Sequence, residues 1–337
     1  MTLFRLISEI TIGSYKFNYT SNITITKSFN KMTDTATIVM PNKFLKNNKT
    51  ITVGSNNVFK KNDPVTIKFG YFPNLKTEFE GFISKITPDS PLKLECQDRM
   101  FLLKQINLDS KTFRNATVKD VVSYVAPNET IIYDDADAHI GEFQIDNKSF
   151  INAVEVFKIL NKQFGFKIFY KSGVLHVRIL TSILTQAGDT IKMGFQKHII
   201  SSNLTYVKEE DLDMVIKAES ILDNNKRIIL YGSKNNDKIL ISKEKQNAAQ
   251  TKPMVKYNFT EAQLRAEIER TIDDFIYEGY DGKYKAFLEP SVNPEDKIEL
   301  VDYKNLERSG TYSVRSVHKE FGIGGGRQTI ELRNKVS

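Results

Sequence analysis

Hydrophobic and polar residues alternate regularly between Asp63 and Ile86. Val65, Ile67 and Phe69 are separated by single polar residues, and Phe79, Gly81 and Ile83 resume the alternation after a segment that contains Gly, Pro and Asn. A period of two with one apolar face is typical of a half-buried strand, and Gly, Pro and Asn favour chain reversal. The pattern therefore predicts a β-hairpin with one dry and one solvated face.

The same arrangement recurs near the C-terminus, between Asp296 and Val317. We equate these positions of the two hairpins: Asp63 with Asp296, Val65 with Ile298, Ile67 with Leu300, Tyr71 with Tyr303 and Gly81 with Gly310. A unit that occurs twice indicates two related β domains rather than a solenoid, which needs three or more stacked units. The alternative is that any two amphipathic hairpins look alike.

The first 108 residues consist almost entirely of predicted strands and turns. Short alternating segments recur at near-regular spacing, at residues 10–12, 17–19, 23–26, 36–40 and 92–96, and a short helix is expected at 98–103. Such spacing is typical of a sandwich or barrel. We expect an N-terminal tube-like β-barrel domain over residues 1–108.

Residues 109–198 have a different character, that of a small α/β domain. Thr117 is a good N-cap for a helix that ends at Pro127, a short strand is expected at 131–133, and Ser149 is expected to cap a second helix that ends at Gly165. A hairpin with a tight glycine turn follows at 166–179.

Residues 199–337 return to β character, with strands expected at 199–206, 214–221, 227–231, 239–241 and 328–332. One helix interrupts them at 260–279. Thr260 and Gln263 form its capping box, Gly279 ends it, and its apolar stripe consists of Leu264, Ile268, Ile272 and Phe275. The predicted fold class is therefore mainly β with an α+β insertion, in which two antiparallel tube-like β-barrel domains flank a small α/β domain.

The amino-acid composition limits the classes of function that the protein could have. The 337 residues include 48 basic and 41 acidic side chains, a formal charge of +7, with lysines spread along the chain rather than gathered in a nucleic-acid-binding arm. The single cysteine, Cys96, excludes an internal disulfide. We recognise no signal-peptide core and no apolar run long enough to span a bilayer, so we expect a soluble protein without membrane anchoring.

Three motifs could carry chemistry, and each has a simpler explanation. The acidic segment 134–139, which ends in His139, lacks EF-hand spacing and is better explained as a solvated turn. The glycine-rich segment 322–327 lacks the Gly-Lys-Ser/Thr ending of a P-loop and is expected at a hairpin tip. Glu78 and Glu80 could serve a glycosidase, but we expect both on one solvated strand face.

No nucleophile with a convincing base is recognisable, and Cys96 is expected to be buried in a strand. We therefore expect no catalytic residue, no metal site and no cofactor. The best competing class rests on the aromatic and basic residues Phe69, Tyr71, Phe72 and Lys76, which could form a stacking platform for single-stranded nucleic acid.

Several stretches resemble the late control gene D family of phage tail baseplate hub proteins, which includes the hub part of type VI VgrG-like spikes. The segments from Asp63 to Asp98 resemble the family's N-terminal barrel, 150–179 its inserted α/β domain, and 310–332 its closing hairpin. The sequence departs from hub proteins fused to their spike, because it ends at Ser337 without β-helical repeats. If the resemblance holds, the spike is a separate polypeptide.

The resemblance implies a structural protein, not an enzyme: a homotrimer whose two barrels per chain form a pseudo-sixfold ring between the hexameric tail tube and the trimeric spike. The implied location is the tail baseplate of a virion or a phage-like particle, such as a contractile injection system or prophage product, assembled in the bacterial cytoplasm. A basic lumen could let DNA pass without specific binding. The alternative function is that of a monomeric OB-like barrel protein that binds single-stranded nucleic acid or an oligosaccharide.

Overall fold

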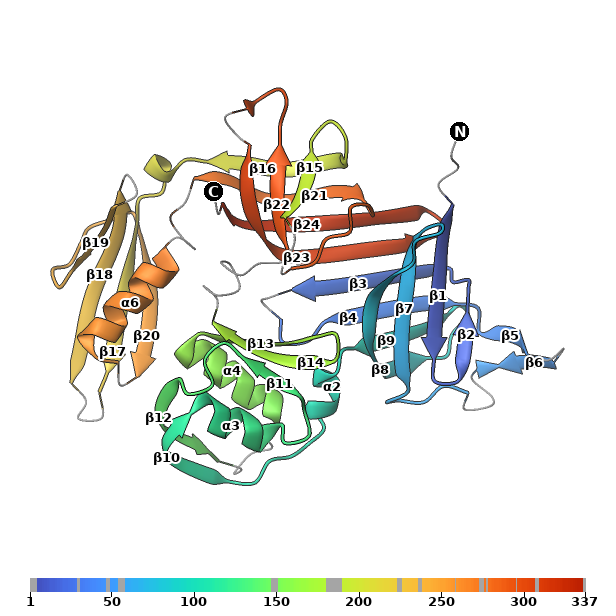
Figure 1. The fold of residues 1–337 in the computed structure, drawn as a ribbon, viewed down its shortest axis with the longest axis horizontal. Coiled ribbons are helices and arrows are strands. Elements are labelled where there is room, and N and C mark those ends of the chain that lie inside the picture. Colours follow the sequence, from blue (N-terminus) through green and yellow to red (C-terminus); the bar gives the residue numbers. More distant parts are fainter. Residues whose placement is uncertain are drawn as a thin grey trace.

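The fold was established from a computed structural model. It describes residues 5–28, 31–46, 49–53, 58–146, 151–179, 190–222, 226–235, 238–257, 259–272, 276, 278–294, 296–306 and 309–335. The protein is mainly β with large antiparallel sheets, as predicted (Figure 1). Serine 149 and Phe275 lie outside the described residues, and no helix within the described ranges is long and apolar enough to cross a membrane.

A 13-stranded sheet runs through both ends of the chain. Its first half has the spatial order β2-β1-β7-β8-β9-β4-β3, and all neighbours are antiparallel. These strands enclose a core built on Ile10, Ile38, Ile67 and Leu94. The strand bounds are β1 Leu6–Ile12, β2 Tyr15–Phe17, β3 Asn22–Ser28, β4 Thr35–Met40, β7 Pro64–Tyr71, β8 Lys76–Thr87 and β9 Leu92–Gln97, with a separate hairpin of β5 Lys43–Lys46 and β6 Lys49–Thr52. The strand predicted at 17–19 thus lies slightly earlier, at β2.

The second half of the sheet has the order β15-β22-β23-β24-β21-β16 and its own core, which includes Tyr284, Tyr312 and Ile330. Its strands are β15 Thr190–Gly194, β16 Ile199–Val207, β21 Gly279–Phe287, β22 Lys297–Val301, β23 Gly310–Gly322 and β24 Gly325–Lys335. Because β15 belongs to this sheet, the second β unit begins before residue 199, where the predicted boundary was placed.

The two halves share one strand order. In chain order, β1, β3, β4, β7, β8 and β9 correspond to β15, β16, β21, β22, β23 and β24, and each set is arranged across the sheet as first, fourth, fifth, sixth, third, second. One strand differs in direction, since β1 is antiparallel to β7 whereas β15 is parallel to β22. The halves join where β3 pairs with β23, between Asn22–Ser28 and Ser316–Gly322 (Figure 1).

An α/β unit separates the two halves in sequence. It contains α3 Val118–Val125 and α4 Ala153–Phe164, the hairpin β13 Phe166–Lys171 and β14 Val174–Ile179, the parallel strand β11 Ile131–Tyr133, and the pair β10 Lys111–Thr117 and β12 His139–Ile145. The short α2, Met100–Leu103, leads into it. Thr117 caps α3 and Gly165, with φ of 78°, ends α4, as predicted. Asn152 caps α4, rather than the predicted Ser149, because its side chain accepts from Val154 and Glu155 N–H.

A second inserted unit interrupts the second half between β16 and β21. It is a separate sheet of β17 Met214–Ile221, β18 Arg227–Asn235, β19 Lys238–Ser242 and β20 Gln250–Tyr257, covered by α6 Glu261–Ile272. Its own core gathers Ile216, Leu230, Leu264 and Ile268. The prediction that these strands and the helix at 260–279 belong to the second barrel is therefore corrected. Gly279 does not end the helix but begins β21.

Candidate assembly interface

A β-bulge directs the side chain of Glu78 toward the junction between the two halves of the sheet. In the β7–β8 register Ile67 lies opposite Phe79 and Lys68 opposite Thr77, which leaves Glu78 as the extra residue. A bulge of this kind re-aims a side chain. Glu78 is buried and Glu80 is exposed. The prediction that both acids share a solvated face is therefore wrong, because strict alternation is broken between them.

Lys319 from β23 meets Glu78 across this junction. Its ammonium group contacts Glu78 Oε2 and donates to Ser291 Oγ at 2.7 Å, and Ser291 donates to Glu78 Oε1 at 3.0 Å. The side chains of Lys319 and Glu78 are only 1% and 6% exposed. Burial lowers the pKa of Lys319, and the charge of Glu78 opposes that effect. Removing one partner of such a pair leaves an uncompensated buried charge, so the pair ties the halves together.

The segment around Ser291 is held by further contacts with both halves. Gln328 donates to the carbonyl oxygens of Phe287 and Pro290 at 2.8 and 2.6 Å and accepts from Val292 N–H at 3.1 Å. Lys27 from β3 donates to Asn293 Oδ1 at 3.0 Å. These polar groups therefore have defined partners, which favours one fixed orientation of the two halves.

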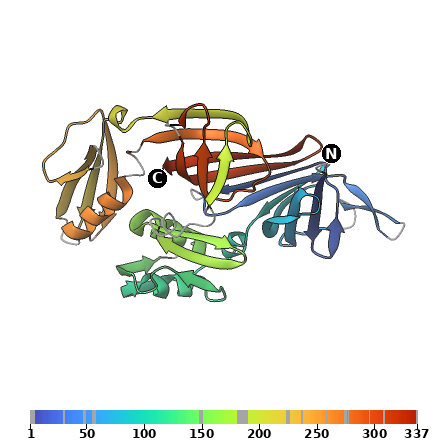
Figure 2. The same cartoon turned by 45° about the horizontal axis from the view of Figure 1, so that its top comes forward.

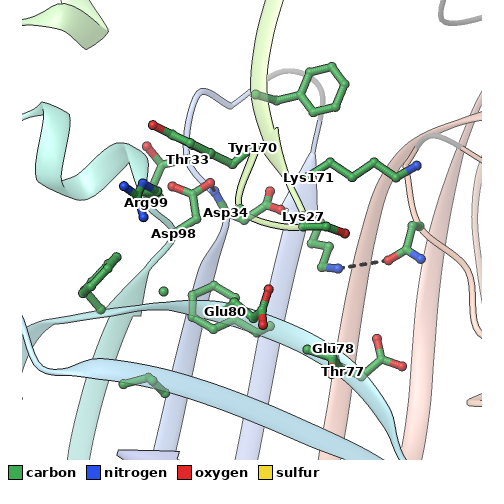
Figure 3. A pocket seen from close by; sticks show the side chains of 18 of the residues that line it. Lys27, Thr33, Asp34, Thr77, Glu78, Glu80, Asp98, Arg99, Tyr170 and Lys171 are labelled. Carbon is green, nitrogen blue, oxygen red and sulfur yellow. Dashed lines mark hydrogen bonds between the residues drawn. The ribbon is translucent and has the colours of Figure 1, made fainter. Parts of the chain in front are cut away.

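A cavity of about 700 Å³ lies beside the junction, between the first half and the α/β unit (Figure 3). Figure 3 shows Lys27, Glu80, Asp98 and Arg99 around it, with Tyr170 and Lys171 entering from the β13 side. Its charged residues are of both signs. Arg99 pairs with Glu129 at 2.8 Å, so this guanidinium is committed to a structural contact.

Asp98 is an acid of this cavity whose pKa is strongly shifted. Its carboxylate accepts from Asp34 N–H at 2.9 Å and Met100 N–H at 3.0 Å. Burial, with a smaller contribution from the charge of Asp34, raises the pKa of Asp98 to about 7. The residue anchors the start of α2 to the β3–β4 connection, which is a structural role.

The eight repeat positions lie in two matching hairpins. Asp63 and Asp296 directly precede β7 and β22, and Val65, Ile67, Ile298 and Leu300 are all buried. The register, however, places Gly81 opposite Val65 but Tyr312 opposite Ile298, while Gly310 lies opposite Leu300. Gly81 therefore corresponds to Tyr312, two residues beyond the predicted Gly310.

A second bulge supports this corrected alignment. The β8–β9 ladder skips one residue between Ile83 and Lys85, and the β23–β24 ladder skips one between Val314 and Ser316. Ile83 then corresponds to Val314, which again sets Gly81 against Tyr312. Sequence reasoning missed Lys319 and Ser291 and placed Glu78 on the wrong face. The one available signal is that Lys319 falls between inward-facing Val317 and Phe321.

The other candidate motifs do not converge on a reactive centre. Residues 134–138 form a turn in which Asp134 pairs with Arg178 at 2.8 Å, and Gly322 and Gly325 close the β23–β24 hairpin tip. Cys96 is buried, as expected, and burial raises its thiol pKa to about 12. Among the described residues, no group of three or more His, Cys, Asp or Glu could hold a metal ion.

The aromatic and basic residues proposed as a stacking platform do not share one open surface. Phe69 is buried and stacks on Phe321 with ring centroids 5.0 Å apart, whereas Phe72 is exposed. Lys76 pairs with Glu289 at 3.0 Å. The first half uses these residues partly as core and partly as contacts with the second half.

Solved structures share this fold, whereas no family model and no curated protein matches the sequence. The chain is similar to a tail protein of Neisseria meningitidis, with 10% identity, a TM-score of 0.67 and coverage of 98% of this chain and 97% of that one. A 43 kDa tail protein of prophage MuSo2 from Shewanella oneidensis matches with 14% identity, a TM-score of 0.62 and coverage of 97% of each chain.

A third similar structure is the Escherichia coli c3393 protein, described as a type VI secretion component that resembles the T4 phage tail proteins gp27 and gp5. It is 10% identical with a TM-score of 0.60, and the match covers 97% of this chain and 77% of that one. The chain therefore has the fold of phage tail and baseplate-hub-type proteins, in agreement with the resemblance found in its sequence.

Proposed function

We propose that the chain is a structural baseplate hub protein: a homotrimeric, pseudo-sixfold ring that joins a hexameric tail tube to a trimeric spike. The observation that carries the proposal is the strand order shared by the two halves of the sheet. Two similar units per chain give six similar positions in three chains, so one face can match a sixfold tube while the assembly stays threefold.

Assembly rather than catalysis is supported by how the polar residues are used. The buried charged pair at the junction, Glu78 and Lys319, links two halves of the chain. Glu78 also lines the neighbouring cavity, but its carboxylate is bonded to Lys319 and Ser291 and is therefore committed to a structural contact. A closed ring also covers sheet edges that would otherwise be open to aggregation. The neighbours in phage tails and a type VI apparatus support a location in a virion or phage-like particle. Assembly in the host cytoplasm, with a spike protein and a tube protein as partners, is part of the proposal.

We propose further that DNA passes through the ring without specific binding and that the solvated face of the sheet lines the channel. Lys93 pairs with Glu95 at 3.0 Å, and Lys285 with Glu320 at 3.4 Å, on strands from both halves. Opposite charges in alternation give little net attraction for phosphate, since non-specific affinity for DNA depends on uncompensated Lys and Arg.

The mass of the full chain in solution tests the proposal. We expect three chains per particle at micromolar concentration, with six similar lobes around a channel in electron micrographs. A C-terminal fusion to a trimeric coiled coil supplies the local concentration that a spike would give. A chain that stays monomeric and whose fused form shows no ring would contradict the proposal. Tight, steeply salt-dependent binding of single strands by that monomer would support the OB-like alternative.

A further inference from the structure

Strand β16 occupies, in the second half, the place that β3 occupies in the first. Through β4 and β21, the registers equate Ile25 with Leu204 and Thr26 with Thr205. The outer edge of β3 is covered by β23. Within the described residues, β16 pairs only with β21, so its outer edge has no strand neighbour in the chain.

The strand that would cover β16 has a counterpart as well. β23 covers β3 with the part that follows its bulge, beginning at Ser316. The matching bulge in β8 equates Ser316, Val317 and His318 with Lys85, Ile86 and Thr87. In the described part of the chain these three residues pair only with β9, which leaves the side facing away from β9 open.

The exposure of side chains at equivalent positions also indicates that the edges of β16 and β8 are open. At the closed seam, Ile25 is 1% exposed and Val317 is 0% exposed. Their equivalents Leu204 and Ile86 pack against the two cores but are only half-buried. Apolar positions that lose burial at both open edges indicate surfaces that another strand completes.

We propose that β16 of one copy of this chain pairs antiparallel with β8 of the next copy and so repeats the β3–β23 seam between chains. The closed seam sets the register: Thr205 lies opposite Thr87, Tyr206 opposite Ile86 and Val207 opposite Lys85, as Thr26 lies opposite His318 within the chain. The inference rests on the proposed ring, and it names the surface through which each copy contacts the next.

The seam between copies is shorter than the one within the chain. Strand β8 ends at Thr87, before Pro88 and Pro91, whereas β23 continues to Gly322. The seam between copies therefore contains three pairs of opposed strand residues, whereas the β3–β23 seam within the chain contains seven. A proline has no N–H to extend a ladder, so we expect the contact between copies to be the weaker one, and trimers to form more readily when a trimeric partner holds the chains together.

Disulfide trapping tests the register. The double variant Thr87→Cys/Thr205→Cys, made in the full chain with and without the C-terminal coiled coil, is oxidised mildly and run on a non-reducing gel. We expect covalent species of two and three chains, because directly opposed strand residues lie within disulfide reach. Thr26→Cys/His318→Cys is the matched positive control, since the Thr26 hydroxyl and His318 Nδ1 are 2.8 Å apart, and it should close within one chain.

The shifted pair Thr87→Cys/Asn203→Cys controls for register and should cross-link poorly. A trimer by mass whose predicted pair forms no covalent species, while the positive control closes, overturns the strand pairing and leaves the proposed ring intact. Preferential cross-linking of the shifted pair overturns the register. A chain that shows neither trimers nor rings overturns the proposed function, and the seam with it. Buried Cys96 stays in all variants.

Discussion

The two halves of the large sheet use one strand order but fill it with different side chains. Where the first half buries Ile38 against Leu94, the second buries Tyr284 against Ile330. The Tyr284 hydroxyl finds a partner in Met193 Sδ at 3.3 Å. Where the first half has Gly81, the second has Tyr312, whose hydroxyl accepts from Tyr280 N–H at 3.1 Å. The strand order and the bulge that follows Ile83 and Val314 are thus shared while the core residues differ, which is why the repeat is faint in the sequence.

The largest expected effect concerns the pair that connects the halves. Lys319→Met leaves Glu78 buried without its cation and should lower the free energy of unfolding by about 3–5 kcal/mol in urea titrations. Lys285→Met is the matched control, because Lys285 meets Glu320 at the surface of the second half and should cost less than about 1 kcal/mol. The double variant Glu78→Leu/Lys319→Met should recover most of the loss. Equal effects of the two single lysine variants would contradict a connecting role.

The second expected effect is a pH dependence of the unfolding free energy that arises from Asp98 in the first half. Folded Asp98 keeps its proton up to a pKa of about 7, while the unfolded chain releases it near 3.8, so the folded state binds more protons between these values. The free energy of unfolding should therefore fall as the pH rises from about 4 to about 7, by at most about 4 kcal/mol from this residue.

Asp98→Asn isolates this contribution. Urea titrations at several pH values should show a shallower decline for Asp98→Asn than for the unchanged chain. The exposed turn variant Asp135→Asn should keep the original slope. Parallel pH profiles for Asp98→Asn and the unchanged chain would show that Asp98 titrates normally.

A third effect compares a glycine of the first half at a close backbone approach with a glycine of the second half in open space. A Cβ on Gly81 would collide with the carbonyl oxygen of Gln97, so Gly81→Ala should cost about 2–3 kcal/mol of unfolding free energy. Gly324→Ala, at the tip of the second half's hairpin, has open space around its Cβ and should change stability by less than about 0.5 kcal/mol. Similar thermal unfolding of both variants would mean that the close approach at Gly81 relaxes freely.

The smallest effect compares the two inserted units. The hydroxyls of Thr117 and Thr260 each accept from the backbone N–H three residues later. The backbone N–H groups of the two threonines donate in return to the side chains of Asp120 and Gln263 respectively. Thr117→Ala and Thr260→Ala should each cost about 1 kcal/mol, and hydrogen exchange should rise in the helix that follows the changed residue. Thr112→Ala, on an exposed strand position, serves as the control. Increased exchange in the other unit's helix would contradict the separation of the two cores.

Local chemistry was predictable from the sequence. Both capping boxes, the left-handed Gly165 and the hairpin tip at Gly322–Gly325 follow from residues close together in the chain. The buried faces of β7 and β22 follow from alternation. These features depend on bonds within a few residues, which a single sequence displays directly.

Long-range features were not predictable in this way. The β3–β23 seam joins residues almost 300 positions apart, and no local pattern specifies the partner of a strand. The bulge at Glu78 shifts one side chain across the sheet without changing the residue types around it. The strands near α6 alternate like those of the barrels, so alternation could not show that they form a sheet of their own.

The second inserted unit, which contains β17–β20 and α6, is attached to the large sheet at a point where sequence can be added or removed. It leaves the large sheet at Val207 and returns at Gly279, and these residues are direct neighbours across β16 and β21. In the first half, the corresponding strands β3 and β4 are joined by residues 29–34 alone. A domain whose two ends meet can be exchanged, enlarged or deleted while the strand pairing of the large sheet stays intact.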